Sequence, residues 1–145
     1  MDIVRRQAAM AAGLLLAAGL SACSPRTATP VPEPKVKVAD VALGRALGAD
    51  KRVAAPSATF APTDVVYASV VTEGDAKRAT LTARWTYQGS VVGQTAQDIA
   101  PRGHTVTEFH VFNPAGWAPG EYRVEILLDG RVMADRSFRV SAEKP

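Results

Sequence analysis

The feature that most constrains this fold is a strict alternation of apolar and polar residues. The stretch ATLTARWTY, residues 79–87, places Ala79, Leu81, Ala83, Trp85 and Tyr87 at every second position. Threonines and one arginine fill the positions between them. Successive side chains of a strand point to opposite faces, so this period of two predicts an antiparallel strand with one face in a core and the other in water.

A second region, EYRVEILLDGRVMADRSFRV, predicts two more strands joined by a tight turn. Asp129-Gly130 is a two-residue hairpin signal, because a type I′ turn needs positive φ at both central residues. The expected inner face comprises Tyr122, Val124, Ile126, Leu128, Val132, Ala134, Phe138 and Val140. Arg123, Glu125 and Leu127 are expected on the opposite face. Arg136 interrupts the inner face, and we expect it near the exposed end of its strand.

The remaining chain supplies further short strands. DVVYASVVT, residues 64–72, is apolar on both faces, as in a central strand, whereas VKVADVALG is typical of an edge strand. SVVGQTAQDIA and HTVTEFHVF also predict strands, and RALGADKRV a short helical turn. About seven short strands, frequent turn signals and no long helical pattern predict an all-β fold, a two-sheet antiparallel β-sandwich over residues 36–145.

A resemblance sharpens this expectation. GWAPGEYRVEI resembles the corner before strand F of immunoglobulin-like and fibronectin-III-like domains. The resemblance implies that Tyr122 is the corner tyrosine, with its hydroxyl bonded to backbone upstream, and that Trp85 is the buried tryptophan of strand C. Val124 stands where antibody domains carry their second cysteine. The segments FAPTDVVYASV, ARWTYQGSVV and GWAPGEYRVEILLDG also look like those of small uncharacterised envelope lipoproteins of proteobacteria.

The first residues predict an export signal. Arg5 and Arg6 precede a continuous apolar run from Ala8 to Leu20, which is shorter than the roughly 20 residues that span a bilayer. Leu20-Ser21-Ala22-Cys23 resembles the lipobox of bacterial lipoproteins. The resemblance implies cleavage between Ala22 and Cys23 and lipidation of Cys23, which would anchor the protein to a membrane through acyl chains such as palmitate.

A proline-rich stretch follows the cysteine. SPRTATPVPEPKV has prolines at 25, 30, 32 and 34, which predicts an extended tether of roughly 35 Å over residues 24–35. The expected organisation is therefore a signal peptide at 1–22, a lipidated cysteine and linker at 23–35, and a sandwich at 36–145. Ser24, directly after the cysteine, is compatible with the outer membrane in Gram-negative lipoproteins. The expected location is thus the bacterial envelope, facing the periplasm.

Charge and cysteine content exclude some classes of function. The chain has 17 Lys and Arg against 14 Asp and Glu, and loss of residues 1–22 removes two arginines and one aspartate, so its net charge falls from +3 to +2. The basic residues form no stripe, which argues against nucleic acid as a partner. Cys23 is the only cysteine, so the core must hold the domain without a disulfide.

The sequence contains few candidates for chemistry. His104, Glu108 and His110 have even spacing and would share one strand face. Glu108 and His110, with a ligand from a neighbouring strand, could bind zinc or copper, whereas His104 would lie about 20 Å from His110. A hydrolase or accessory enzyme using either histidine is the other alternative. No nucleophile elbow and no glycine-rich phosphate loop is present, so we expect no enzyme and no cofactor.

Trp117, in the loop NPAGWAPG, has two interpretations. It is either an exposed anchor for a partner or glycan, or a cap that closes one end of the sandwich, and the stiff proline-containing loop favours the cap. The leading prediction is a non-catalytic, lipid-anchored binding or structural module that contacts an envelope protein or a cell-wall component, with Trp117, Glu108 and His110 as candidate binding residues.

Overall fold

The computed structural model describes residues 35–142. The predictions for the signal peptide, for Cys23 and for the tether up to residue 34 lie outside these residues. The described part contains eight strands in the order β1 (Val36–Gly44), β2 (Thr59–Phe60), β3 (Val66–Gly74), β4 (Ala79–Tyr87), β5 (Ser90–Ile99), β6 (His104–Val111), β7 (Gly120–Leu128) and β8 (Arg131–Val140).

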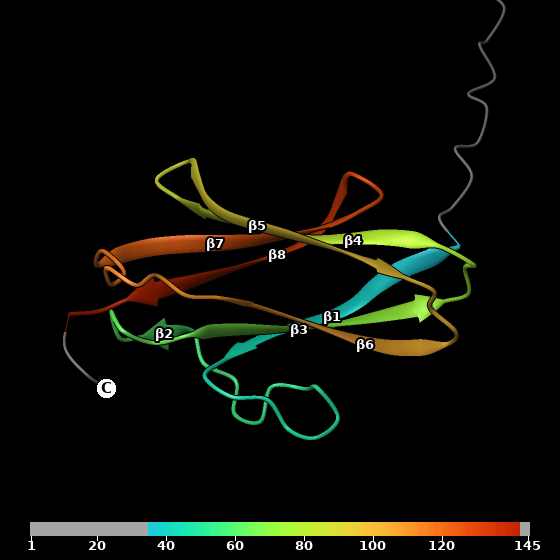
Figure 1. Ribbon diagram of the computed structural model, residues 1–145, viewed down its shortest axis with the longest axis horizontal. Coiled ribbons are helices and arrows are strands. Elements are labelled where there is room, and N and C mark those ends of the chain that lie inside the picture. Colours follow the sequence, from blue (N-terminus) through green and yellow to red (C-terminus); the bar gives the residue numbers. More distant parts are fainter. Residues whose placement is uncertain (1–34, 143–145) are drawn as a thin grey trace, which may run out of the picture. The chain divides into compact units, whose positions relative to one another are not determined.

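The strands form two sheets packed face to face (Figure 1). One sheet has the order β1-β3-β6 and the other β2-β8-β7-β4-β5, and every pair is antiparallel except β2 with β8. These orders match strands A-B-E and G-F-C-C′ of immunoglobulin-like sandwiches. The predicted all-β, two-sheet sandwich is therefore confirmed, with eight strands where about seven were expected. The additional strand, β2, has two residues, too few to produce a periodic signal.

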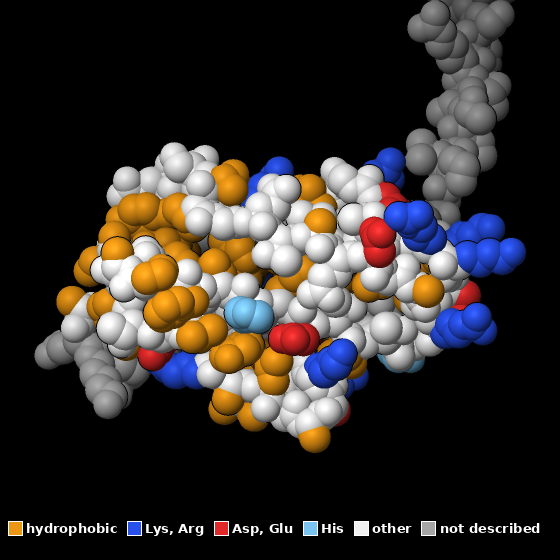
Figure 2. All heavy atoms as spheres, viewed as in Figure 1, with side chains coloured by type: hydrophobic (Ala, Val, Ile, Leu, Met, Phe, Trp, Pro, Cys, Tyr) orange, Lys and Arg blue, Asp and Glu red, His pale blue; other side chains and the backbone are white. Residues whose placement is uncertain are grey.

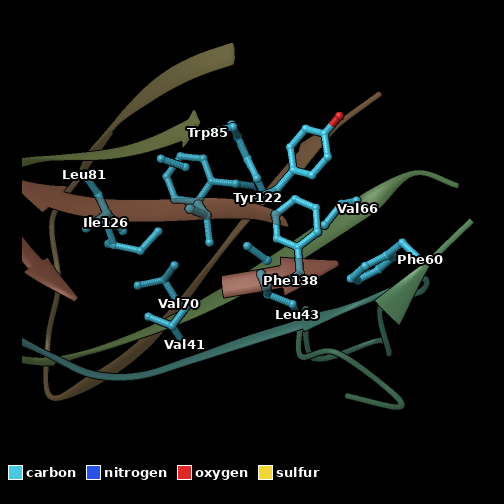
Figure 3. Close-up of a cluster of buried hydrophobic side chains, with 14 of the residues drawn as sticks. Val41, Leu43, Phe60, Val66, Val70, Leu81, Trp85, Tyr122, Ile126 and Phe138 are labelled. Carbon is cyan, nitrogen blue, oxygen red and sulfur yellow. The ribbon is translucent and has the colours of Figure 1, made fainter. Parts of the chain in front are cut away.

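The core lies between the two sheets and contains most of the residues predicted to face it. Trp85, Leu81 and Ile126 are fully buried, and burial of such a side chain stabilises the fold by about 1.5–3 kcal/mol. Phe138 packs edge-to-face against Trp85 at 6.0 Å and against Phe60 at 5.4 Å between ring centroids. Figure 3 shows these side chains of the five-stranded sheet together with Val41, Leu43, Val66 and Val70 of the three-stranded sheet.

The predicted hairpin is present between β7 and β8. Asp129 and Gly130 have φ values of 49° and 81°, as a type I′ turn requires. The turn is also bonded to β4, because the Thr80 amide donates to the Asp129 carboxylate and the Asp129 amide donates to the Thr80 carbonyl, both at 2.8 Å.

One face assignment in β8 is wrong because of a β-bulge. Ile126 pairs with Ala134, but Leu127 pairs with Val132, so Met133 is an extra residue in β8. Because of this extra residue, the β8 side chains that precede it in the chain point to the opposite face from the one that simple alternation predicts. Val132 consequently leaves the core face and is 47% exposed.

The prediction for Arg136 is also wrong. Arg136 lies opposite Val124 in the middle of β8 and reaches across to β1 in the other sheet. Its Nε donates to the Val41 carbonyl oxygen at 3.0 Å, and its Nη2 lies 3.8 Å from a carboxylate oxygen of Asp40. Because the arginine side chain is long, its aliphatic part lies on the inner face while its charged guanidinium group reaches the solvent-accessible edge of the sandwich at β1.

The expected helical turn within residues 45–53 is absent. Lys51 has φ of 63°, the Gly48 amide donates to the Arg52 carbonyl at 2.7 Å, and Leu47 forms an isolated bridge with Val53. The segment is instead a loop, in which Gly48 and the left-handed backbone of Lys51 reverse the chain direction. In residues 35–142 no helix is long and apolar enough to cross a membrane.

The sandwich has two ends that matter for function. The entry end is where β1 begins, with Val36 opposite Gly74, and it includes the loops at 75–78, 100–103 and 129–130. The far end includes the turn at 88–89 and the loop at 112–119, which leaves β6 after Val111. In Figure 1 the far end is on the left.

Candidate functional site

Trp117 lies at the far end, buried beneath its loop. It is 5% exposed, its indole Nε1 donates to the Asp64 carbonyl at 2.9 Å, and its amide donates to the Pro62 carbonyl at 2.8 Å. These bonds tie the loop to the segment before β3. The arrangement agrees with the interpretation of Trp117 as a cap.

Tyr122 makes the corner that the sequence resemblance implies. Its hydroxyl donates to the Ala118 carbonyl at 2.8 Å, four residues upstream. Its ring stacks on Tyr87 at 4.4 Å and on Phe138 at 5.3 Å, and meets Trp117 edge-to-face at 5.5 Å. Burial, and then the nearby Tyr87 hydroxyl, raise the pKa of Tyr122.

These aromatic rings border a hollow of about 460 Å³, which we call the far-end hollow. It lies between the start of β5 and the loop after β6. The lining residues are Tyr87, Val92, Phe112, Asn113, Pro114, Gly116, Trp117, Ala118 and Tyr122. None of them is charged, but Trp117 and Tyr122 are almost fully buried, so the aromatic surface open to a ligand comes chiefly from Phe112 and Tyr87, beside polar groups of the loop. The hollow is therefore suited to an apolar side chain or a sugar ring.

Two large apolar side chains stand exposed at the hollow. Val92 is 45% exposed and Phe112 53% exposed, and the neighbouring Val91 is 56% exposed. The loop that carries Phe112 is held by the Asn113 side chain. Its Nδ2 donates to the Gly116 carbonyl at 2.8 Å, and its Oδ1 accepts from the Ala115 backbone amide at 3.0 Å. The apolar groups are thus presented on a stiffened loop and a strand.

Sequence reasoning missed Val92, Phe112 and Tyr87 as residues of this site. A signal exists in Val91-Val92, since two adjacent valines in a strand cannot both face the core. Phe112 could not be found this way, because its exposure depends on where β6 ends.

Glu108 and His110 lie on β6, apart from the far-end hollow. Phe109 faces the core at 1% exposure, while His104 and His110 are exposed. His110 Nδ1 is 4.0 Å from a Glu108 carboxylate oxygen, and its ring lies 5.7 Å from that of Tyr67. Neither Glu108 nor His110 lines the hollow with Trp117, so the structure does not unite the three candidate residues.

The two alternatives based on these residues, a zinc or copper site and a histidine-dependent enzyme, gain no support from the structure. Within residues 35–142, no group of three histidine, cysteine, aspartate or glutamate side chains is placed to hold a metal ion. In the same part of the chain, neither histidine is hydrogen-bonded to a serine or threonine hydroxyl, as a histidine-activated nucleophile would be.

A larger hollow, of about 730 Å³, lies on the outer face of the five-stranded sheet. Its charged side chains are paired across the strands: Arg84 with Glu125 at 2.7 Å, Arg123 with Asp135 at 3.6 Å, and Arg139 with Glu121. Because each arginine faces a carboxylate, this surface presents little net charge to a ligand.

Comparison with known proteins locates similar structures but no close relative. No protein-family profile matches the sequence, and no curated protein matches it. An immunoglobulin-like protein of Pseudomonas aeruginosa has a TM-score of 0.49 and 14% identity over 74% of this chain and 98% of its own. A DNA glycosylase of Pseudomonas fluorescens, AlkC, has a TM-score of 0.46 and 15% identity, over 73% of this chain and 30% of the glycosylase.

A β-glucosidase of Listeria innocua has a TM-score of 0.46 and 7% identity, over 70% of this chain and 16% of the enzyme. This chain therefore spans only a minor part of both enzymes. The assignment of the fold rests on the strand order and register of this chain itself.

Proposed function

We propose that this protein is a lipid-anchored component of a bacterial cell envelope. In this proposal its β-sandwich is a non-catalytic module, which contacts another envelope protein or a cell-wall component through the far-end hollow. The observation that carries the proposal is the exposure of Val92 and Phe112 together at the far-end hollow. Exposed apolar groups beside an aromatic hollow are typical of binding surfaces.

The position of the hollow supports this proposal. The described chain enters the sandwich at the entry end, and the far-end hollow lies at the opposite end of β3 and β6. The far-end hollow is therefore remote from Val36, where the described part of the chain begins its first strand. Figure 2 shows apolar side chains gathered toward the far end and lysine and arginine side chains toward the entry end.

Lipidation is supported by the sequence Leu20-Ser21-Ala22-Cys23 behind a charged and an apolar segment. Acyl chains stabilise membrane attachment by about 0.8 kcal/mol per buried methylene, so two or three chains make a stable anchor. Labelling growing bacteria with radioactive palmitate tests this step. The full chain should carry label and the Cys23→Ser variant none; an unlabelled, soluble wild-type chain would rule out the anchor.

Binding at the far end is tested by photo-crosslinking in cells. A photoreactive amino acid placed at Phe112 should give an adduct with an envelope protein or with wall material. The same amino acid at Val132 is the matched control, because Val132 is also a large exposed apolar residue but begins β8 at the entry end. Equal adducts at both positions, or none at Phe112, would contradict the proposed binding surface without affecting the lipidation result.

A further inference from the structure

A sandwich of two open sheets has four edges, and each free edge can pair with another strand. In residues 35–142 these edges are β1 and β6 in one sheet and β2 and β5 in the other. Proteins protect such edges by short strands, bulges, charges or covering side chains. Three of the four edges here are protected.

The edge at β2 is two residues long. The edge at β1 carries a bulge between Val38 and Asp40, and Arg136 bonds to its Val41 carbonyl. The edge at β6 is covered by β5, because the Gln97 side chain donates to the Glu108 carbonyl at 2.7 Å. A strand from outside would have to break these contacts.

The edge at β5 is less protected: on its inner face Gly93 lies close to Val111 and Gln97 bonds to Glu108, both in β6, whereas its outer-face residues are exposed. β5 has ten residues, SVVGQTAQDI, nearly all exposed, with no lysine, arginine or proline. Its one charge, Asp98, is already bonded to Arg78 and Thr80 at 2.9 Å each. Its bulge is confined to Val92, where the register shifts, so Gly93–Ile99 is regular.

We propose that β5 pairs with β5 of a second copy of this chain, antiparallel about a two-fold axis. The pairing would join the two five-stranded sheets into one. A two-fold interface requires a self-complementary surface, and the composition of β5 meets this requirement. A strand with several like charges would repel its own copy, whereas this edge has only one charge and that charge is neutralised locally.

The regular part of β5 specifies a register. Pairing centred on Ala96 places Gln94 opposite Asp98 of the second copy and Thr95 opposite Gln97. Gln94, Ala96 and Asp98 face outward with Arg84, Thr82 and Thr80, so each pair shares one face of the joined sheet. The amide of Gln94 can donate to the carboxylate of Asp98, and no like charges meet.

Cross-linking of the full chain in cells tests this contact. An Ala96→Cys variant treated with a short bis-maleimide should give a covalent dimer. The wild type, with Cys23 as its single cysteine, provides the baseline. Ser137→Cys is the matched control, exposed in β8 of the same sheet. A dimer band no stronger than that of Ser137→Cys, or an adduct only with another protein, would overturn the proposal.

A charge exchange tests the same edge independently of cross-linking chemistry. Ala96→Lys and Ala96→Glu each place like charges opposite each other in a dimer, so two differently tagged full-length copies should co-purify at least several-fold less than wild type. Co-expression of one Lys copy with one Glu copy should restore the yield. Undiminished co-purification of either single variant, or no recovery in the mixture, would exclude β5 as the interface. Ala96 does not line the far-end hollow, so neither outcome bears on the proposed partner site.

Discussion

The Tyr122 hydroxyl donates a hydrogen bond to the carbonyl oxygen of Ala118 at 2.8 Å, and this bond closes the corner between the 112–119 loop and β7. The same ring stacks between Tyr87 and Phe138, so one side chain links the loop, the neighbouring strand β4 and the core. The far-end hollow is built on this corner.

Replacing Tyr122 with phenylalanine should lower the free energy of unfolding by about 1 kcal/mol, because the hydrogen bond is lost while the ring packing stays. Equilibrium unfolding in urea measures this change. Tyr87→Phe is the control: its hydroxyl donates to the Pro119 carbonyl at 3.2 Å in an exposed position, so a smaller effect is expected. An equal loss in both variants would contradict a special role of the corner.

The raised pKa of Tyr122 predicts a loss of stability at alkaline pH. Burial makes the folded protein hold this proton more tightly than the unfolded chain, where the tyrosine ionises near its ordinary value of about 10. Its contribution is therefore complete below about pH 10 and is lost as the pH rises through the folded pKa. Urea unfolding from about pH 8 to about pH 11 should show this decline. The decline should be shallower in Tyr122→Phe, and an unchanged slope would refute the assignment.

The burial of Trp117 predicts weak quenching of its fluorescence by acrylamide. The measurement needs Trp85→Phe, which leaves Trp117 as the single tryptophan. That change costs no hydrogen bond within the described residues, because the Trp85 Nε1 has no partner there. Quenching as strong as that of the urea-unfolded variant would show that the loop opens and that Trp117 is accessible to a partner.

Gly74 is expected to tolerate no side chain. Its φ is +120°, and an added Cβ would clash with the Lys35 carbonyl in the first residues of the domain. Gly74→Ala should lower the free energy of unfolding by about 3 kcal/mol or more, from backbone strain and steric overlap. Gly89→Ala is the control, since Gly89 has φ of +80° with open space around it, and should cost about 1–2 kcal/mol. Thermal unfolding compares them, and equal melting temperatures would exclude the clash.

Arg136→Met should destabilise the sandwich by about 0.5–1.5 kcal/mol, because the Val41 carbonyl on the other sheet loses its donor while the aliphatic bulk remains. Arg123→Met is the matched change in the same sheet. It breaks only an exposed ion pair with Asp135 at 3.6 Å and should cost less than about 0.5 kcal/mol. Urea unfolding ranks the two variants, and the reverse order would show that the bridge between sheets contributes nothing.

Local pattern in the sequence determined the elements of this fold. The alternation of Leu81, Ala83 and Trp85 requires a strand with one buried face, and Asp129-Gly130 requires a tight turn, because both depend on the geometry of neighbouring residues alone. The corner bond of Tyr122 was implied by the resemblance of its segment to immunoglobulin-like corners, and it is also local, since donor and acceptor are four residues apart.

Tertiary structure alone decided the features that join distant segments. Met133 became a bulge through its pairing with β7, which turned Val132 outward, and Arg136 found the Val41 carbonyl across 95 residues of sequence. The far-end hollow and the free edge of β5 have the same origin. Exposure of Val92, Phe112 and Ala96 depends on which strands pack beside them, and a strand's own sequence does not encode the absence of a neighbour.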